Sequence, residues 1–258
     1  MARTVTVKGV TIGAGAPKVI VPLTGATRDA LVAQAERLAA LGAGVGPDVA
    51  EWRADLYDDV EDIAAVVATG RRLAAALAGI PVLFTFRTDR EGGERPLSED
   101  CYVALLLAVV AAGVVDLVDV ELMGTPERVR EVVEFAHKHG AAVVMSNHDF
   151  TGTPGKDEIV ARLRRMQELG ADLPKIAVMP RSPADVLVLL DATYTMASQH
   201  ADRPLITMAM AGDGVVSRLA GEIFGSACTF AMNGEASAPG QVPLADLRRS
   251  LALIHAAR

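Results

Sequence analysis

The sequence has little of what marks several classes of protein. Its two cysteines, Cys101 and Cys228, lie far apart and in no metal-ligand or redox spacing, so we interpret both as ordinary buried thiols in a reducing compartment. No run approaches eighteen uninterrupted apolar residues, and residues 1–10 carry no apolar signal core. We therefore expect a cytoplasmic protein that makes no use of a membrane.

Basic charge and aromatic residues are also scarce. The chain has 25 Lys and Arg against 32 Asp and Glu, which gives a net charge of −7. A nucleic-acid surface needs clustered basic residues that displace counterions from phosphates, so we expect no nucleic-acid partner and favour a small-molecule substrate. An anionic substrate is still allowed, because a few buried arginines can reverse the field within a cleft.

Short apolar runs recur along the chain, with helical segments between them. The runs are typical of buried strands and cover residues 18–23, 47–53, 81–87, 115–121, 141–147, 173–179, 204–210 and 226–231. Segments with helical spacing include residues 27–41, 63–77, 126–138 and 156–169. Eight strands that alternate with helices favour a (β/α)8 barrel, formed by residues 1–258 as one domain, over an open parallel sheet.

Local signals define the ends of these elements. Thr27, Thr125 and Ser182 each precede a predicted helix and offer a side-chain oxygen for capping. Residues 1–13 alternate apolar and polar side chains around Lys8-Gly9. This pattern predicts a β-hairpin, which we expect to close the bottom of the barrel.

Ionisable residues gather where the apolar runs end. Because catalytic groups in a parallel barrel come from the C-terminal ends of strands, these residues are candidates for a site. They are Glu51, Arg53, Arg87, Glu91, His148 and Arg218, with Lys175 inside the sixth run. Glu51 and Arg53 alternate with Trp52, so both point into the barrel if Trp52 faces the helices. A purely structural ion pair is the alternative, but several buried charges favour recognition of a polyhydroxylated anion.

Lys175 and His148 are the candidates for chemistry. Lys175 lies in the apolar stretch 173–179, where an ammonium is costly to desolvate. Either its stem is packed with its head in water, or it is a Schiff-base lysine that attacks a ketone. His148 stands where a barrel places a general acid or base, although a structural hydrogen-bonding role is also open. The histidines that we interpret as solvated are His137, His139 and His200.

Several segments together match one family in order and spacing. They are Glu51-Trp52-Arg53-x-Asp55, Phe84-Thr85-Phe86-Arg87-Thr88, Glu91-Gly92-Gly93-Glu94, Ser146-Asn147-His148-Asp149-Phe150, Pro174-Lys175-Ile176-Ala177, residues 206–210, Ser217-Arg218 and Ala236-Ser237-Ala238-Pro239-Gly240-Gln241. In these segments, and over essentially its whole length, the chain resembles the type I 3-dehydroquinate dehydratases, the Schiff-base-forming hydro-lyases of the shikimate pathway.

The resemblance implies a homodimer of (β/α)8 barrels that removes water from 3-dehydroquinate without a metal or cofactor. It implies that Lys175 forms the imine with the C3 ketone, that His148 is the acid/base, and that Glu91 holds the His148 ring. The substrate-binding residues that it implies are Arg218, Ser237 and Gln241 at the carboxylate, Glu51, Arg53 and Arg87 at the ring hydroxyls, and Met208 in the pocket wall. We expect residues 236–241 to form a lid.

Departures from the family pattern lie outside this set. Pro22 stands where the family often has Ser, while Asp213 and Glu235 lie in turns where relatives carry basic or hydroxyl residues. These differences bear on the lid and on affinity. A biosynthetic and a quinate-degrading role both remain open.

Two other functions can be weighed against this one. A Schiff-base aldolase would share a lysine on the sixth strand, but the region after the last two runs lacks glycine-rich amides for a phosphate. A barrel that binds a metabolite without turnover would need neither Lys175 nor His148, and both are present. Borohydride trapping with 3-dehydroquinate distinguishes the enzyme from a binding protein.

Overall fold

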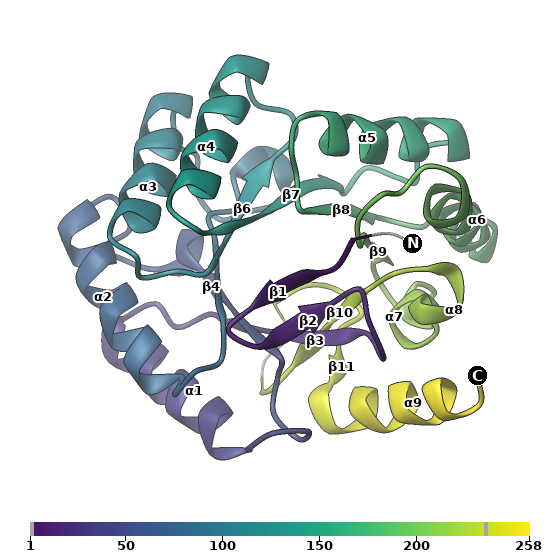
Figure 1. The fold of residues 1–258 in the computed structure, drawn as a ribbon, viewed down its shortest axis with the longest axis horizontal. Helices are drawn as coiled ribbons and strands as arrows, with labels where there is room; N and C mark the ends of the chain where they lie inside the picture. Colours follow the sequence, from purple (N-terminus) through teal and green to yellow (C-terminus); the bar gives the residue numbers. More distant parts are fainter. Residues whose placement is uncertain (1–2, 235–236) are drawn as a thin grey trace.

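The computed structural model describes residues 3–234 and 237–258. Its centre is a set of parallel strands, one for each predicted run (Figure 1). They are β3 (Lys18–Leu23), β4 (Val49–Arg53), β5 (Val82–Thr85), β6 (Leu117–Glu121), β7 (Ala142–Asp149), β8 (Leu173–Val178), β9 (Ile206–Ala209) and β10 (Cys228–Met232). Each strand from β3 to β8 pairs with the next, and β10 pairs with β3. A bridge between Leu205 and Ser226 joins the β9 and β10 segments, which closes the predicted barrel.

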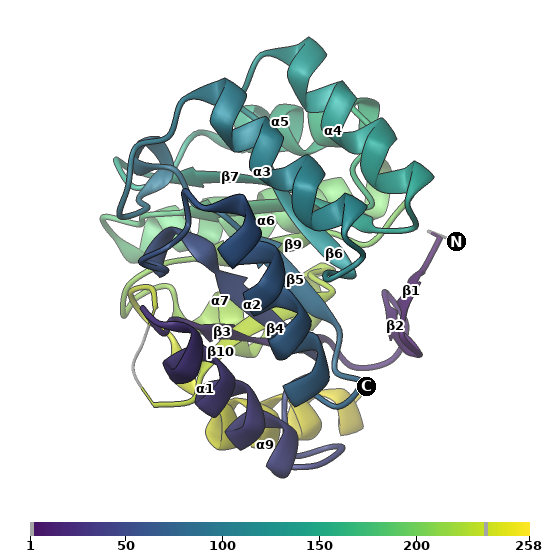
Figure 2. The same ribbon diagram turned by 90° about the vertical axis from the view of Figure 1, so that its left-hand side faces the viewer.

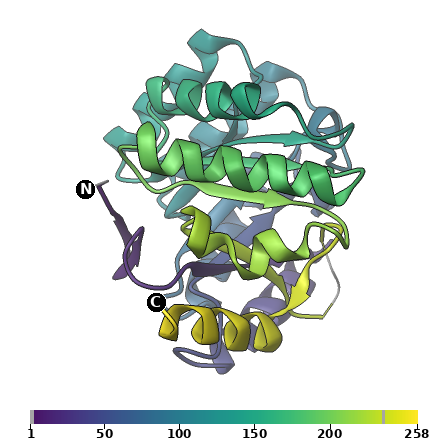
Figure 3. The ribbon, with the colours of Figure 1, turned by 90° about the vertical axis from the view of Figure 1, so that its right-hand side faces the viewer.

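Helices lie outside the strands, as Figures 1 and 2 show, and Figure 3 shows the side with α6 in green and α9 in yellow. They are α1 (Arg28–Ala40), α2 (Ile63–Ala76), α3 (Glu99–Ala111), α4 (Pro126–Lys138), α5 (Lys156–Glu168), α6 (Pro183–Gln199), α7 (Val215–Leu219), α8 (Gly221–Phe224) and α9 (Leu244–Ala256), with short 3-10 helices η1 (Ala54–Leu56) and η2 (Asp89–Glu91). A short strand β11 (Val242–Pro243) pairs with β10. No helix of the described residues is long and apolar enough to cross a membrane.

The predicted helix starts are correct, but the predicted caps are only partly so. Thr27 accepts a hydrogen bond from the Ala30 amide, as expected of a capping side chain. Thr125 and Ser182 precede α4 and α6, yet neither side chain caps its helix. The Thr125 hydroxyl donates to Glu99 at 2.7 Å instead, so its oxygen is directed toward α3.

An antiparallel hairpin closes the N-terminal end of the barrel, as predicted. Strands β1 (Val5–Val7) and β2 (Val10–Ile12) pair across a turn in which Lys8 and Gly9 both have positive φ. Val5 and Ile12 join a buried apolar cluster whose members include eight residues toward the N-terminal ends of the strands, one from each barrel strand. We call those eight residues the lower ring: Ile20, Val49, Leu83, Leu117, Val144, Leu173, Ile206 and Cys228.

A second apolar core fills the space between the strands and the helices. Trp52 is fully buried there, with Phe84 and Tyr57 packed edge-on at ring-centroid distances of 5.2 and 5.9 Å. Because neighbouring side chains on a strand alternate, Glu51 and Arg53 therefore point into the barrel.

The expectation of two buried cysteines is wrong for one of them. Cys228 is buried in the lower ring, whereas Cys101 is exposed. Cys101 lies in the first turn of α3, whose buried face is formed by Tyr102, Leu105 and neighbouring residues. Its position on the helix, rather than the apolar character of a thiol, decides its exposure.

Candidate active site

A cavity of about 150 Å³ opens at the C-terminal ends of the barrel strands. Every site residue predicted from the sequence lines it, although the residues come from segments far apart in the chain. Phe150, Met210 and Phe230 add apolar wall. The cavity is therefore a single polar site with a partly apolar lining, which is the usual form of a small-molecule site.

Lys175 lies on β8 with only 3% of its surface exposed, so the solvated alternative is wrong. Its Nζ lies 3.5 Å from Asp119 Oδ2, 3.9 Å from Glu51 Oε1, and 4.6 Å from the centre of the Phe230 ring. A buried ammonium is retained only with such partners. The arrangement holds the amine at a fixed point inside the cavity.

Arg87 joins the carboxylates around Lys175 into one buried network. Its Nη2 donates to Asp119 Oδ1 at 2.8 Å, and its Nη1 donates to Glu121 Oε1 at 2.8 Å and to the Ser146 hydroxyl at 3.0 Å. Burial alone would lower the pKa of Arg87, but its attraction to Asp119, Glu121 and Glu91 raises that pKa well above the ordinary value. Arg87 therefore stays charged and fixes the carboxylates around it.

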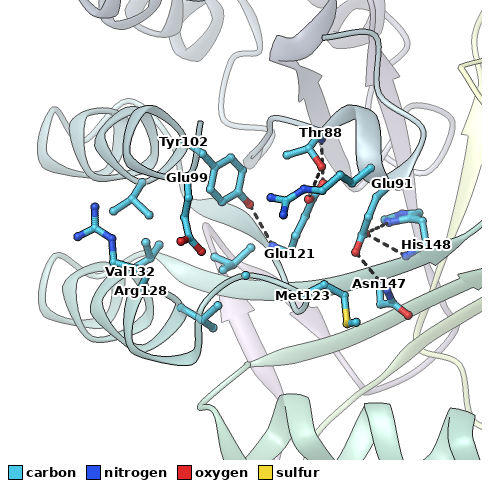
Figure 4. Close-up of a pocket in the computed structure, with 15 residues that line it drawn as sticks. Thr88, Glu91, Glu99, Tyr102, Glu121, Met123, Arg128, Val132, Asn147 and His148 are labelled. Atoms are coloured by element: carbon cyan, nitrogen blue, oxygen red, sulfur yellow. Dashed lines mark hydrogen bonds and ion pairs between the residues drawn. The ribbon is translucent and has the colours of Figure 1, made fainter. Parts of the chain in front are cut away.

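His148 and Glu91 form a close pair at the edge of the cavity, and Figure 4 shows their contact in a close-up of a neighbouring pocket. The His148 Nδ1 lies 2.9 Å from Glu91 Oε2, which also accepts from the His148 backbone N–H at 3.0 Å. The Asn147 side chain donates to Glu91 Oε1 at 3.1 Å. These donors fix the Glu91 carboxylate, which accepts from the His148 Nδ1–H and so orients the ring. In this tautomer the lone pair of the imidazole lies on Nε2.

The two members of this pair have pKa values shifted in opposite directions. Burial raises the pKa of Glu91 to about 7, with a smaller lowering by Arg87. Burial lowers the pKa of His148 well below its usual range, and the nearby charges of Arg87, Lys175 and Arg53 lower it further. The imidazole is therefore neutral at neutral pH and can accept a proton.

A glycine turn positions Glu91. Gly92 adopts a φ of 83° at the end of η2, and a Cβ on Gly93 would collide with the Arg87 backbone. The chain can therefore fold back tightly over the end of β5 only with glycine at this point. The sharp turn directs Glu91 toward His148 on β7.

Arg53 is held by its neighbour rather than left free. Its Nε and Nη2 donate to the two oxygens of Asp55, each at 2.8 Å. Burial lowers the pKa of Arg53, but this bidentate pair more than offsets that effect and raises it. Its Nη1 donates to the Ser237 carbonyl at 3.4 Å.

Arg218 differs from the other arginines of the site. It is 2% exposed and, within residues 3–234 and 237–258, it forms no ion pair. Its Nη2 donates to the Pro239 carbonyl at 3.1 Å, while Nε is buried without a hydrogen-bond partner in that same part of the chain. Burial lowers the pKa of Arg218 to about 10. A buried cation with free donors is a ready receptor for an anion.

The segment expected to form a lid lies over the cavity in its described part, residues 237–241; Glu235 and Ala236 lie outside the described residues. The Gln241 side chain accepts from the Ser237 amide at 2.9 Å and donates to the Ser237 hydroxyl at 3.0 Å. The Ala211 amide donates to the Pro239 carbonyl at 3.2 Å. The first two bonds stabilise the segment internally, and the third ties it to the loop after β9.

A second cavity, of about 130 Å³, lies behind Glu91 and His148, which line both (Figure 4). Tyr102, Thr88 and Glu121 form part of its wall, and the Tyr102 hydroxyl accepts from the Glu121 amide at 3.0 Å. Nothing in the sequence signalled this space, because it lies between α3 and α4 and depends on how the two helices pack.

Three polar residues next to the predicted ones were missed as members of the site. Asp119 and Glu121 lie on β6 and Ser146 on β7, and all are buried in the Arg87 network. A signal for the first two was present, because the fourth run alternates in the same way as Glu51 and Arg53. The exposed histidines His137, His139 and His200 agree with their interpretation as solvated. Among the residues described, no group of His, Cys, Asp and Glu could hold a metal ion.

Comparisons with known proteins agree on one family. The family model described as type I 3-dehydroquinase matches residues 19–258. The chain is 57% identical over 252 residues to a 3-dehydroquinate dehydratase from Syntrophotalea carbinolica, covering 98% of each chain. It is 49% identical over 250 residues to the enzyme from Bacillus subtilis, covering 97% of this chain and 96% of the other.

Solved structures give the same result for the fold. The crystal structure of a type I 3-dehydroquinate dehydratase from Clostridium difficile with covalent modified comenic acid matches 100% of both chains, with a TM-score of 0.96 and 50% identity. A 3-hexulose-6-phosphate synthase from Salmonella typhimurium, at 16% identity and a TM-score of 0.57, shares the fold alone.

Proposed function

The chain belongs to the type I 3-dehydroquinase family of hydro-lyases, and from this membership we propose how its residues remove water from 3-dehydroquinate to give 3-dehydroshikimate. One observation carries the proposal: a buried amine on Lys175, a neutral imidazole on His148 and a buried guanidinium on Arg218, which has no acidic partner within residues 3–234 and 237–258, line the same cavity. Those three groups are what a covalent elimination on an anionic ketone requires.

Lys175 forms the covalent intermediate in this proposal. Its Nζ attacks the C3 ketone, and loss of water from the resulting carbinolamine gives a protonated imine. The imine withdraws electrons and makes the neighbouring C2–H acidic. The buried position of Lys175 supports this role, because its surroundings fix the amine and exclude bulk water. A relative with covalent modified comenic acid also supports covalent chemistry in such a site.

His148 transfers the proton. Its Nε2 takes the C2 proton, which leaves an enamine on Lys175, and then returns a proton to the C1 hydroxyl as that group departs as water. Glu91 keeps the ring in the tautomer that can do this, through the 2.9 Å contact with Nδ1. Hydrolysis of the remaining imine releases the product and restores the amine.

Arg218 binds the substrate carboxylate. Its free donors and its lack of an acidic partner in the described part of the chain support this role, and Ser237 and Gln241 lie on the same side of the cavity. A carboxylate can accept two parallel hydrogen bonds from one guanidinium. Residues 237–241 then close over the bound acid.

The ring hydroxyls and the ring itself contact the part of the cavity wall that β4 and β9 form. Glu51 and Arg53 offer an acceptor and a donor there, and Met208 supplies apolar contact. Arg87 lies beside them, although both of its Nη groups already donate within the network. Its contribution to hydroxyl binding is therefore the smallest of the three charged residues.

Borohydride reduction tests the covalent step. The protein is incubated with 3-dehydroquinate and borohydride, and its intact mass is measured, followed by peptide mapping. An adduct on Lys175 is the expected result, and the sample without substrate is the control. If the protein turns over without any adduct, or if the adduct maps to another lysine, the proposed intermediate is wrong.

We also propose that the whole chain forms one catalytic domain and that it acts as a cytoplasmic homodimer. The assembly rests on family membership. Light scattering at micromolar concentration should give twice the chain mass of 27.0 kDa, and a mass equal to one chain would contradict the dimer.

A further inference from the structure

The two oxygens of the Asp119 carboxylate have different surroundings. Oδ1 accepts hydrogen bonds from Arg87 Nη2 at 2.8 Å and from the Ser146 hydroxyl at 2.6 Å. Oδ2 is buried, accepts no hydrogen bond from residues 3–234 or 237–258, and lies 3.5 Å from Lys175 Nζ. One oxygen is thus fixed by the protein, and the other faces the amine.

A buried acceptor without a hydrogen bond costs free energy, so Oδ2, whose contact with Lys175 Nζ is an ion pair at 3.5 Å and not a hydrogen bond, indicates that a closer contact forms during function. The surrounding protein holds this oxygen in place, because Asp119 is fully buried and bonded through its other oxygen. Lys175 is the group that changes chemically within reach of it. Lys175 Nζ, 3.5 Å away, is therefore the described group best placed to pair with Oδ2.

We propose that Asp119 is the counter-ion of the protonated imine on Lys175, and that it holds the proton on Nζ while the C2–H bond breaks. The inference rests on the proposed imine at Lys175. Nζ adds to the ketone carbon, the carbinolamine loses its oxygen as water, and the C=N bond that forms keeps one proton on nitrogen. Electrons released from C2–H then neutralise this nitrogen as the enamine forms.

The imine needs an anion in this position. Three guanidinium groups, on Arg53, Arg87 and Arg218, line the same cavity, and each of them disfavours a further positive charge. A neutral imine is a much weaker electron sink than a protonated one. An ionised carboxylate 3.5 Å from nitrogen offsets the arginines and keeps the sink strong.

Asp119 is better suited to this role than Glu51. Glu51 Oε1 lies farther from Nζ, at 3.9 Å, and already accepts from the Thr85 hydroxyl at 2.9 Å. Burial alone would raise the pKa of Asp119, but attraction to Arg87 and Lys175 and the hydrogen bonds from Ser146 and Arg87 lower it below the ordinary value. Asp119 therefore stays ionised while Glu51 faces the substrate.

Two reducing agents separate the protonated imine from the neutral one. Cyanoborohydride reduces the protonated imine, whereas borohydride reduces both forms. The ratio of the two trapping rates, measured by intact mass with 3-dehydroquinate at a fixed neutral pH, therefore reports the protonated fraction. In Asp119→Asn, which keeps the shape but loses the charge, we expect this ratio to fall at least about tenfold.

Glu121→Gln is the matched control. Glu121 lies two residues further along β6, is also buried, and also binds Arg87 at 2.8 Å, but it has no contact with Lys175 among the described residues. This variant disturbs the same arginine network and should keep the native ratio. An unchanged ratio in Asp119→Asn, or an equal fall in Glu121→Gln, overturns the counter-ion role.

The outcomes also separate this inference from the proposed function. If the unmodified protein forms no adduct with borohydride, the imine itself is wrong, whereas an adduct with an unchanged ratio in Asp119→Asn removes only Asp119. Circular dichroism checks folding. If Asp119→Asn does not fold, Asp119→Ala is used instead, because it leaves space for a small anion beside Lys175. The trapping-rate ratio of this variant should be low, and added formate should raise it by replacing the lost carboxylate. A native ratio without formate contradicts the inference.

Discussion

Two rings of side chains inside the barrel, set two residues apart on the same strands, have opposite chemistry. The lower ring at the closed end is apolar on every strand. The upper ring is mostly polar, and its members are Pro22, Glu51, Thr85, Asp119, Ser146, Lys175, Met208 and Phe230. Two residues along a strand correspond to about 7 Å. Stability and chemistry are therefore built into one set of strands, separated by this short distance.

The two rings contribute to the protein in different ways. The lower ring removes apolar surface from water, which stabilises the fold by roughly 25 cal/mol per Å². The upper ring buries charges, and desolvation cancels much of the gain from their pairing. What it provides is a fixed geometry, because its residues project from strands that the lower ring holds together. Changes in the two rings should thus affect different measurements.

The largest expected effect comes from Lys175→Ala in the upper ring. Without the amine no imine can form, so turnover and the borohydride adduct should both be lost. The lower ring is untouched, so the far-ultraviolet circular dichroism spectrum should match that of the unmodified protein. Intact mass and a turnover assay check this together, and a reducible adduct in this variant would contradict the assignment.

His148→Ala should separate capture from proton transfer. The amine of Lys175 is still present, so an adduct with substrate should accumulate. Elimination should fall by roughly 10²- to 10⁴-fold, which is the usual effect of losing a general acid/base. The adduct is followed by mass and the elimination by product formation; turnover at the native rate would show that another group moves the proton.

Leu173→Ala is the matched change in the lower ring, two residues before Lys175 on β8. Leu173 is 1% exposed and packs in the lower cluster. Truncation to alanine leaves a cavity, and such changes cost about 2–5 kcal/mol of unfolding free energy. Turnover by the folded fraction should fall far less than in Lys175→Ala. Urea denaturation and steady-state kinetics test the contrast, which fails if stability is unchanged.

The division between the rings also explains what could be predicted from the sequence. The apolar runs gave the strands within a few residues, because the lower ring and the outer core both require apolar side chains at fixed spacing. The alternation of Glu51, Trp52 and Arg53 gave the direction of each side chain correctly. Period-two patterns are local and can be read directly.

Contacts between strands were not accessible in the same way. Asp119 and Lys175 are 56 positions apart in the sequence, and their 3.5 Å separation depends on the register of β6, β7 and β8. The pair of Glu91 and His148 was expected only through the family resemblance. Cys101 was misplaced because its face of α3 depends on how the helix packs.

The pH dependence of catalysis should report the protonation state of Glu91. The pKa of Glu91 is raised by burial to about 7, so Glu91 is protonated below that pH and ionised above it. A protonated Glu91 would donate to His148 Nδ1 and place the ring proton on Nε2, where it blocks proton abstraction. We therefore expect kcat/KM to rise with pH through about 7.

Glu91→Gln should remove this rise and lower kcat/KM throughout, because the amide cannot ionise. Glu94→Gln, at an exposed position in the same loop, is the control and should keep the native profile. The test is kcat/KM of both variants, measured in stopped or continuous assays from mildly acidic to mildly basic pH. If Glu91→Gln keeps the rise, another group is responsible for it.

The smallest effect on activity is expected from labelling the two thiols, one at the surface and one in the lower ring. Cys101 is exposed and should react quickly with a thiol reagent, without loss of activity because it does not line the cavity. Burial raises the pKa of Cys228 to about 12, and the thiolate is the reactive form, so Cys228 should react only when the lower ring opens. In Cys101→Ser the labelling rate then measures that opening, and adding Leu173→Ala should accelerate it strongly. Rapid labelling of Cys228 in the unmodified fold, detected by mass, would show that the closed end of the barrel is less tightly held than its packing indicates.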